Sequence, residues 1–371
     1  MGLPSTPPIC QRAEPVCYPI RAGPRRGSGA SGGMADALAS GASAQYGRGG
    51  STPLSRTTPI EMIMKRPSVV GGILKIMSDY HYRNLTSAVK DKGSPLRQHL
   101  DRRFPNTRPL QADYKQQCVS LLVNGGDANP GTLGAAFDFM IRFILDPDHK
   151  PAVAVQAFLD KPPLLAPVVQ VVAAAHTSMT AGDADVLARA SWALALCTEV
   201  YRVRGVLPGS PLALLLQQRE FTADALLSLA SEGAMRQLRD LRKVAEERLL
   251  PSILPATRLD LGPTFDGSAL CPADADLIHD GRLLDIKTHL GALNKRTGAR
   301  SDSLSLTDLY QVLAYALFDR TDVYAIRSLG IYSARYGALV TWPLSEALES
   351  MAGTSIDMAV EREVVWGLLN G

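Results

Sequence analysis

The sequence predicts an α/β protein whose C-terminal part holds a mixed sheet, preceded by an all-α helical region and a disordered leader. Three observations support this prediction. The first 58 residues are rich in Gly, Pro and Ser, residues 110–216 repeat apolar side chains at helical spacing, and the chain after residue 220 alternates short apolar runs with turns. We therefore expect a leader (1–58), a mainly helical domain (59–216) and an α/β domain (221–371).

The leader contains ten Gly, seven Pro and seven Ser and shows little apolar periodicity. A segment of this composition cannot bury enough surface to offset the entropy lost on ordering, so we expect disorder. It carries six arginines against Glu14 and Asp36, so the rest of the chain is near neutral although the whole has a formal charge of +3. Bulk charge therefore does not identify a polyanionic partner. Met34, after Gly-Gly, is an alternative start of translation.

Cysteine usage and hydropathy indicate the compartment. The five cysteines are scattered and form no C-x-x-C pair: Cys10, Cys17, Cys118, Cys197 and Cys271. This pattern is typical of a reducing cytoplasm and provides neither a disulfide framework nor a zinc site. The sequence has no uninterrupted apolar run of about 18 residues and no apolar signal-peptide core. We expect a cytoplasmic protein that does not engage a membrane.

Residues 59–216 read as mainly helical. Prolines interrupt residues 59–108, where we expect short helices and irregular chain. Apolar spacing of three and four then predicts helices at 113–122, 132–145, 152–159, 164–176 and 183–203. No cluster of His, Cys and carboxylates marks this region, so the sequence does not indicate its function. It could hold substrate, a protein partner or a second subunit.

After residue 220 the pattern changes from helical to mixed. A helix begins near Thr222 or Asp224 and stops at Pro251. Strands are predicted at 259–265, 272–279, 282–289, 323–333 and 338–342. Helices are predicted at 305–318, 344–351 and 356–369, with a basic loop at 291–303. The predicted order is α-β-β-β-α-β-β-α-α.

A hairpin around Asp280-Gly281 is the most informative local feature. This dipeptide suits a two-residue turn that needs positive φ at both central positions. Counting outward pairs Leu277 with Leu284, then Asp276 with Asp285, and Asp274 with Lys287. Because side chains alternate, these three acids and Lys287 share one face, while four apolar residues share the other: Ala275, Leu277, Leu284 and Ile286.

Two carboxylates directly opposite each other repel, and a divalent cation between them converts that cost into a binding site. Mg²⁺ suits such a site because it prefers a few carboxylates together with water and phosphate oxygens. Lys287 on the same face could stabilise charge on a scissile phosphate or position the attacking water. The plainer alternative is a solvated hairpin face, since the D-x-K pattern is short.

The residues Asp276-Leu-Ile, the turn and Leu284-Asp-Ile-Lys-Thr288 resemble the D…(D/E)-x-K core of the PD-(D/E)XK nuclease superfamily. The D-x-K-T form is similar to the RecB-like branch, which also carries Q-x-x-x-Y on the next helix; here Gln311 and Tyr315 occupy that motif. The resemblance covers about residues 221–345 and implies a restriction-endonuclease-like αβββαβ core. It departs from the family's Pro-Asp pair, because Ala273 separates Pro272 from Asp274.

The resemblance also implies site residues. Asp276, Asp285 and the Ile286 carbonyl would hold Mg²⁺ or Mn²⁺, with Asp274 accessory and with an acid from the preceding helix. Glu232 is the preferred helix acid, and Glu246 and Glu247 remain alternatives. The catalytic set would be Asp276, Asp285, Lys287, Gln311 and Tyr315.

Other polar residues are weaker candidates. His279 and His289 are read as structural or surface residues. The loop residues Lys295, Arg296 and Arg300 could contact a phosphate backbone, as could the cations of the preceding helix, Arg236, Arg239, Arg242 and Lys243. A basic solvated loop is the alternative. The sequence thus predicts a metal-dependent nuclease acting on nucleic acid, with DNA as the expected polymer; the rival prediction is an inactive nuclease-fold protein that binds nucleic acid or protein.

Overall fold

The computed structural model describes residues 80–371, so the predicted leader and residues 59–79 lie outside the described residues. A five-stranded sheet runs in the order β1-β2-β3-β6-β7. Its strands are β1 (Leu259–Leu261), β2 (Leu277–His279), β3 (Arg282–Lys287), β6 (Ser328–Ser333) and β7 (Ala338–Pro343). Only β3 and β6 pair in parallel, and the other neighbours are antiparallel. The sheet is therefore mixed, as the sequence predicted.

The predicted hairpin is confirmed at its turn. Asp280 and Gly281 have φ values of 45° and 78°, and Leu277 pairs with Leu284 in the expected register. The ladder stops there, so the predicted backbone pairing of Asp276 with Asp285 is not made. Instead the Ile286 N–H donates to the Asp276 carboxylate over 2.5 Å. The Asp276 carboxylate thus accepts the Ile286 N–H in place of a backbone carbonyl of the opposite strand, and β2 ends at Leu277.

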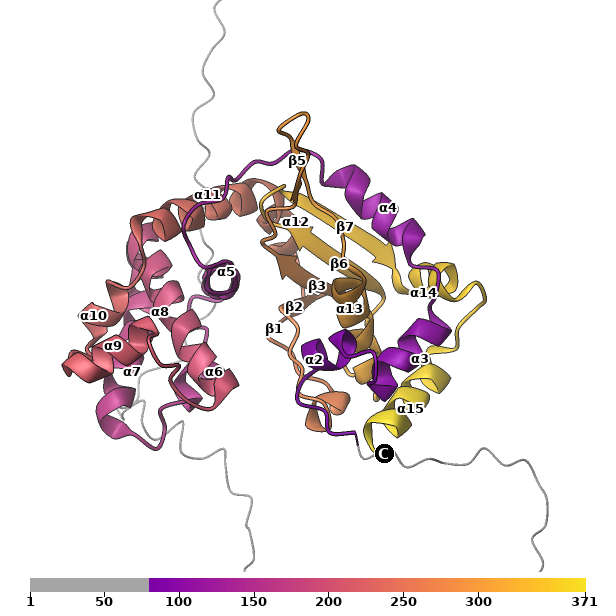
Figure 1. Cartoon of the computed structure of the whole chain (residues 1–371), viewed down its shortest axis with the longest axis horizontal. Helices are drawn as coiled ribbons and strands as arrows, with labels where there is room; N and C mark the ends of the chain where they lie inside the picture. The colour runs from indigo at the N-terminus through magenta and orange to yellow at the C-terminus, as the bar shows by residue number, and fades with distance from the viewer. Residues whose placement is uncertain (1–79) are drawn as a thin grey trace, which may run out of the picture. The chain divides into compact units, whose positions relative to one another are not determined.

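One face of the sheet carries a run of helices (Figure 1). They are α5 (Pro130–Leu145), α6 (Ala152–Gln156), α7 (Pro162–Ala181), α8 (Ala184–Val203), α9 (Pro211–Gln218), α10 (Ala223–Leu227), α11 (Glu232–Arg248) and α12 (Leu250–Ile253). Local signals begin several of them: the Asn129 and Asp183 side chains accept backbone N–H bonds at the starts of α5 and α8. Their apolar faces share one core with Leu277, Leu284 and Tyr332 of the sheet.

The opposite face packs against a second set of helices. They are α2 (Leu85–Lys90), α3 (Pro95–Arg103), α4 (Arg108–Gln117), α13 (Leu306–Phe318), α14 (Leu344–Ala352) and α15 (Met358–Leu369), with the 3-10 turn η2 (Asp266–Ala269) beside them. The central helix α13 is buried along its length between the sheet and α2 and α15 (Figure 1). Ile278, Leu283 and Ile331 supply the sheet side of this core.

The predicted division at residues 216–221 stays a prediction, and the described helices before it contribute to two cores. Helices α2–α4 belong to the same core as α13, so residues 80–216 do not form one separate helical layer. Ala275 likewise lies in the α13 core, not with Leu277 as predicted, because the chain leaves regular strand geometry before β2. Buried Arg335 joins the segment between α4 and α5 to helix α11. It donates to the Asn124 carbonyl at 2.7 Å and to the Gln237 side chain at 2.7 Å.

Two further elements bear on the predictions. A small antiparallel hairpin, β4 (Ala292–Leu293) and β5 (Arg300–Ser301), replaces the predicted loop after β3. Helix α7 is long and apolar enough, by length and composition alone, to cross a membrane, although no transmembrane helix was predicted. In the structure it packs along α8, with Val168, Val171 and Val172 buried in the protein core.

Candidate acidic site

Strand β3 presents Asp285 and Lys287 on the face that meets α13. The two residues are separated by one position, so the alternation of the strand places both side chains on the same side. Lys287 Nζ lies 2.9 Å from Asp285 Oδ2 and 3.4 Å from Asp308 Oδ1. Asp285 is 3% exposed, so this pair lies beneath the surface.

Helix α13 supplies the partners of Lys287. Ser305 caps the helix start by accepting from the Asp308 N–H, which fixes the first turn next to Lys287. One turn further on, the Gln311 Oε1 atom accepts from Lys287 Nζ at 3.4 Å, and Gln311 Nε2 donates to the Tyr315 hydroxyl at 2.6 Å. The predicted same-face placement of Gln311 and Tyr315 is therefore confirmed.

Asp276 lies just before β2, the strand that pairs with β3 on the side opposite β6. Its carboxylate accepts from the Ile286 N–H, and its electrostatic neighbours include Lys287, Arg142 and Asp274. Arg142 lies on α5 and pairs with Asp138 one turn earlier, with Nη2 and Oδ2 2.8 Å apart. Helix α5 thus brings a second ion pair to the end of β2.

These residues form what we call the acidic centre: Asp138, Asp274, Asp276, Asp285 and Asp308, with Arg142 and Lys287. Five carboxylates face two cations, so the centre is short of positive charge. Burial raises the pKa of Asp285 to about 7, and the like charge of Asp276 adds to the shift despite Lys287. Burial also raises the pKa of Asp138 to about 7, again with Asp276 contributing.

The other groups of the centre respond to the same charges. Burial raises the pKa of Asp276, although Arg142 and the Ile286 N–H favour its ionised form. Burial opposes the charge of Lys287, but Asp285 and Asp308 more than compensate and raise its pKa above the ordinary value. For Asp308 burial is likewise outweighed, since Lys287 and the Ser305 hydroxyl lower its pKa. Lys287 therefore stays protonated and Asp308 ionised at neutral pH.

The carboxylate oxygens of the acidic centre are the type of ligand that a hard divalent cation prefers. Asp285 Oδ2 is buried without a well-aligned hydrogen bond, although Lys287 Nζ lies 2.9 Å away. A cation would supply the missing partner and relieve the repulsion among the carboxylates. Between residues 80 and 371, however, no three His, Cys, Asp or Glu side chains are spaced to enclose an ion. Binding would therefore require the side chains to move, with Lys287 the nearest obstacle.

No known protein family, curated protein or solved structure matches this chain. The assignment of its site consequently depends on the residues themselves.

The predicted helix acid Glu232 does not join the acidic centre. It lies in the first turn of α11, its side chain is 73% exposed, and its Oε1 lies 3.6 Å from Arg189 Nη2. Among the helices on the opposite side of the sheet from α13, α5 reaches the centre, because it packs against β3 in the core. Its Asp138 interacts electrostatically with Asp276.

Sequence reasoning missed Asp138, Arg142 and Asp308. A signal for the first two was present: they stand four residues apart in an otherwise apolar helix, Phe137–Leu145, and so share one face. Charged side chains on the buried side of a helix are expected to interact with other polar groups of the protein. Nothing in the local sequence indicated that the partner would be Asp276.

Neither histidine belongs to the acidic centre, but the charge of His289 helps to lower the pKa of Asp308. His279 is 4% exposed at the end of β2, and burial lowers its pKa. His289 is half exposed, with Nδ1 3.9 Å from Asp302 Oδ1. Asp302 itself is buried and accepts from Tyr114 and Ser333 hydroxyls, which ties the end of β5 to α4 and β6.

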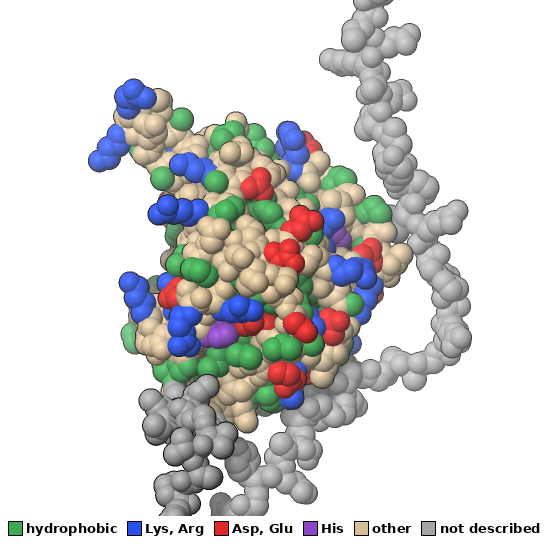
Figure 2. Space-filling model, turned by 90° about the vertical axis from the view of Figure 1, so that its right-hand side faces the viewer, with side chains coloured by type: hydrophobic (Ala, Val, Ile, Leu, Met, Phe, Trp, Pro, Cys, Tyr) green, Lys and Arg blue, Asp and Glu red, His purple; other side chains and the backbone are tan. Residues whose placement is uncertain are grey.

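The hairpin that joins β3 to α13 carries the predicted basic residues. Lys295 and Arg296 are exposed at its tip, where the Asn294 carboxamide orders the turn by accepting from the Arg296 N–H at 3.0 Å. Arg300 has a structural contact, since its Nη1 donates to the Gly291 carbonyl at 2.9 Å. The hairpin projects upward in Figure 1, and Figure 2 shows Lys and Arg side chains on the uppermost projection.

Two of the four predicted cations of α11 are paired: Arg239 binds Asp185 at 3.0 Å, and Arg242 binds Glu246 at 2.7 Å. Arg236 and Lys243 are exposed and form no ion pair within residues 80–371, so they stay phosphate-binding candidates beside the hairpin tip.

Proposed function

We propose that the chain is a metal-dependent nuclease that hydrolyses phosphodiester bonds of nucleic acid, with DNA as the expected polymer. One observation carries the proposal: residues from three separate segments meet in one network. It links Asp276, through the Ile286 N–H, to the β3 pair Asp285–Lys287 and then to Gln311 and Tyr315. These are the residues of the D…D-x-K…Q-x-x-x-Y pattern, and the proposal includes a restriction-endonuclease-like core around them.

Each residue has a role that its contacts support. Asp276, Asp285 and the Ile286 carbonyl would hold Mg²⁺ or Mn²⁺, with Asp138 as the helix acid. The bound cation would polarise the scissile phosphate and lower the pKa of an attacking water. Lys287, held by Asp308 and Gln311, would donate to that water or to a phosphate oxygen. Tyr315 would position Lys287 indirectly, because it fixes the Gln311 carboxamide.

Substrate binding requires positive charge beyond the acidic centre, which by itself repels phosphate. Lys295 and Arg296 provide it on a hairpin whose two ends lead directly into β3 and α13. Exposed cations of this kind contact the nucleic-acid backbone without reading sequence. Binding of the nucleic-acid backbone to the hairpin would therefore bring a phosphodiester bond to the acidic centre.

The decisive experiment combines cation binding with cleavage. Mg²⁺ and Mn²⁺ binding to the whole chain is measured by isothermal titration calorimetry, and single- and double-stranded DNA and RNA are offered with each metal. We expect cation binding and cleavage in the wild type, and loss of both in Asp285→Asn. Asp302→Asn is unsuitable as a control because Asp302 is structural, so Asp240→Asn, an exposed acid on α11, serves instead. Failure of the wild type to cut any of the four substrates would refute the nuclease proposal.

A second candidate is a nuclease-fold protein that binds nucleic acid or protein without cleaving it. The observation in its favour is that Lys287 already neutralises Asp285, while the described carboxylates are not spaced around an ion. In that case the same calorimetry would show no cation binding, and nucleic-acid affinity would be the same with a divalent cation as with a chelator.

A further inference from the structure

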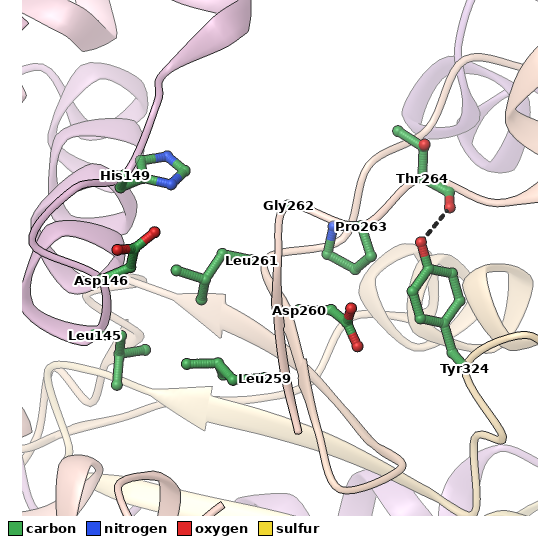
Figure 3. Close-up of a pocket in the computed structure, with 10 residues that line it drawn as sticks. All are labelled: Leu145, Asp146, His149, Leu259, Asp260, Leu261, Gly262, Pro263, Thr264 and Tyr324. Carbon is green, nitrogen blue, oxygen red and sulfur yellow. Dashed lines mark hydrogen bonds between the residues drawn. The ribbon is translucent and has the colours of Figure 1, made fainter. Parts of the chain in front are cut away.

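A cavity of about 630 Å³, which we call the β1 slot, lies beside the edge of the sheet (Figure 3). Leu145, Asp146 and His149, at the end of α5 and in the following loop, form one wall. The segment 259–264 and Tyr324 form the other. The slot adjoins the acidic centre, because the Gly262 N–H donates to the Asp276 carbonyl. None of its described lining residues belongs to that centre, so its occupant is tested separately from the proposed nuclease activity.

The wall formed by β1 is an open sheet edge. Among the strands of residues 80–371, β1 is terminal in the sheet and pairs with β2 alone. On that side the Arg258 carbonyl accepts from the Asp280 N–H at 3.0 Å, and the Gly262 N–H donates to the Asp276 carbonyl at 2.9 Å. Because hydrogen-bonding direction alternates along a strand, Leu259 and Leu261 direct their N–H and C=O groups away from β2. Their side chains meanwhile pack on the core.

The charge of the slot limits what can occupy it. The described residues that line it include Asp146 and Asp260 but no lysine or arginine; Arg142 lies next to Gly262, and Arg258 lies over the Tyr324 ring. The Asp260 carboxylate has a neighbour in Arg258, with Oδ2 and Nε 2.9 Å apart, whereas Asp146 forms no ion pair with any residue of the described chain. Carboxylates at this position repel a phosphate backbone and attract ammonium or guanidinium groups. The chemistry favours a cationic occupant over a nucleic acid.

His149 contributes a buried polar group to the wall of the slot. The residue is 9% exposed, and its Nε2 atom is buried without a hydrogen-bond partner in the described chain. Figure 3 shows its ring on the α5 side of the slot, facing the β1 segment. Burial and the nearby Arg142 lower the pKa of His149 to about 4, so the ring is neutral at pH 7 and keeps one nitrogen as an acceptor. A buried polar atom normally has a partner, and an N–H donor entering the slot would provide one.

We propose that the β1 slot binds an extended, cationic peptide segment of a partner protein. The segment adds to β1 as a further strand and pairs with the outward N–H and C=O groups of Leu259 and Leu261. Its Lys or Arg side chains on one face meet Asp146, and those on the other face meet Asp260, because Asp260 points away from Leu259 and Leu261. Main-chain bonds of this kind give affinity with little dependence on sequence, and the two carboxylates select for positive charge.

The test uses the whole chain and short dye-labelled peptides, with binding followed by fluorescence anisotropy. The probe is a peptide of repeated Lys-Lys-Val-Val (the Lys–Val peptide), which presents Lys on both faces of a strand. A Glu–Val peptide of equal length tests charge, and a fully N-methylated Lys–Val peptide tests strand addition, since it has no N–H groups to donate. We expect the Lys–Val peptide to bind, and each of the other two to bind at least about tenfold more weakly. These controls change only the peptide and so do not depend on the folding of a variant.

The place where the peptide binds is tested by hydrogen exchange and by matched variants. Peptide binding should slow amide exchange at Leu259 and Leu261. Asp146→Asn should weaken peptide binding, whereas Asp148→Asn, which removes the same charge outside the slot lining, should not. Equal binding of the N-methylated peptide or unchanged exchange in β1 would each overturn the proposal.

Discussion

Lys287 Nζ lies 2.9 Å from Asp285 Oδ2, on the same face of the same strand and in contact with the helix that carries Gln311. The ammonium is therefore the counter-ion of a buried carboxylate in this conformation. It stands where a cation bound to Asp285 would also have to stand. Lys287 thus has two roles to separate by experiment, one in stability and one in the proposed chemistry.

Lys287→Met should abolish cleavage and also destabilise the fold. Removing one member of a buried ion pair leaves the other unpaired, at a cost of about 3 kcal/mol at pH 8. Denaturant unfolding measures this cost. The double variant Lys287→Met/Asp285→Asn should recover part of the lost stability but no cleavage. If the double variant cut nucleic acid as the wild type does, Lys287 and Asp285 would both lie outside the reaction.

Stability of the cation-free protein should fall as pH rises from 3.8 to about 7. The pKa of Asp285 is raised from 3.8 to about 7, so the folded state favours the protonated form. Its contribution is complete below the unfolded pKa and is lost as pH rises through the folded pKa. The melting temperature in chelator should therefore decrease between those two values, and Asp285→Asn should flatten the decrease. Added Mg²⁺ should stabilise the protein most above about pH 7, because binding releases the carboxyl proton.

Asp138, and not Glu232, should be the helix acid that supports cation binding. Asp138 interacts with Asp276 across the end of β2, whereas Glu232 is exposed and lies near Arg189. Asp138→Asn should weaken Mn²⁺ binding by about tenfold, a typical effect of removing a metal-supporting group. Glu232→Gln is the matched control and should leave the calorimetric affinity unchanged. The opposite pattern would restore the assignment made from sequence.

The hairpin cations should account for salt-dependent nucleic-acid binding. Lys295→Ala/Arg296→Ala should lower affinity for DNA of any sequence and reduce the slope of log affinity against log salt by about 2. Lys90→Ala/Lys115→Ala removes two exposed cations from α2 and α4 and should change neither quantity. An unchanged slope in the hairpin variant would remove the hairpin from the binding surface.

Hydrogen bonding from Gln311 should matter more to activity than to stability. Tyr315→Phe deletes the hydroxyl that accepts from Gln311 Nε2 at 2.6 Å and should cost about 1 kcal/mol in unfolding. Because Gln311 then loses its support beside Lys287, turnover should fall while the Michaelis constant stays close to that of the wild type. A variant with unchanged turnover would show that Tyr315 is only a core residue.

The sequence by itself determined the local parts of the site. Asp280-Gly281 set the turn and the register of Leu277 with Leu284, which followed from the φ requirement of a two-residue hairpin. The periods of strand and helix then placed Asp285 with Lys287, and Gln311 with Tyr315. Each of these relations spans a few residues along one element, so side-chain direction follows from backbone geometry alone.

Only the tertiary structure decided which elements meet. It joined β3 to β6 in parallel, placed α2–α4 against α13, and brought Asp138 of α5 to Asp276 while leaving Glu232 in solvent. These outcomes depend on which apolar faces bury against each other across long stretches of chain. Asp276 shows the limit most directly: its carboxylate took the Ile286 N–H and ended the ladder, because a buried donor must find a partner and the nearest was a side chain.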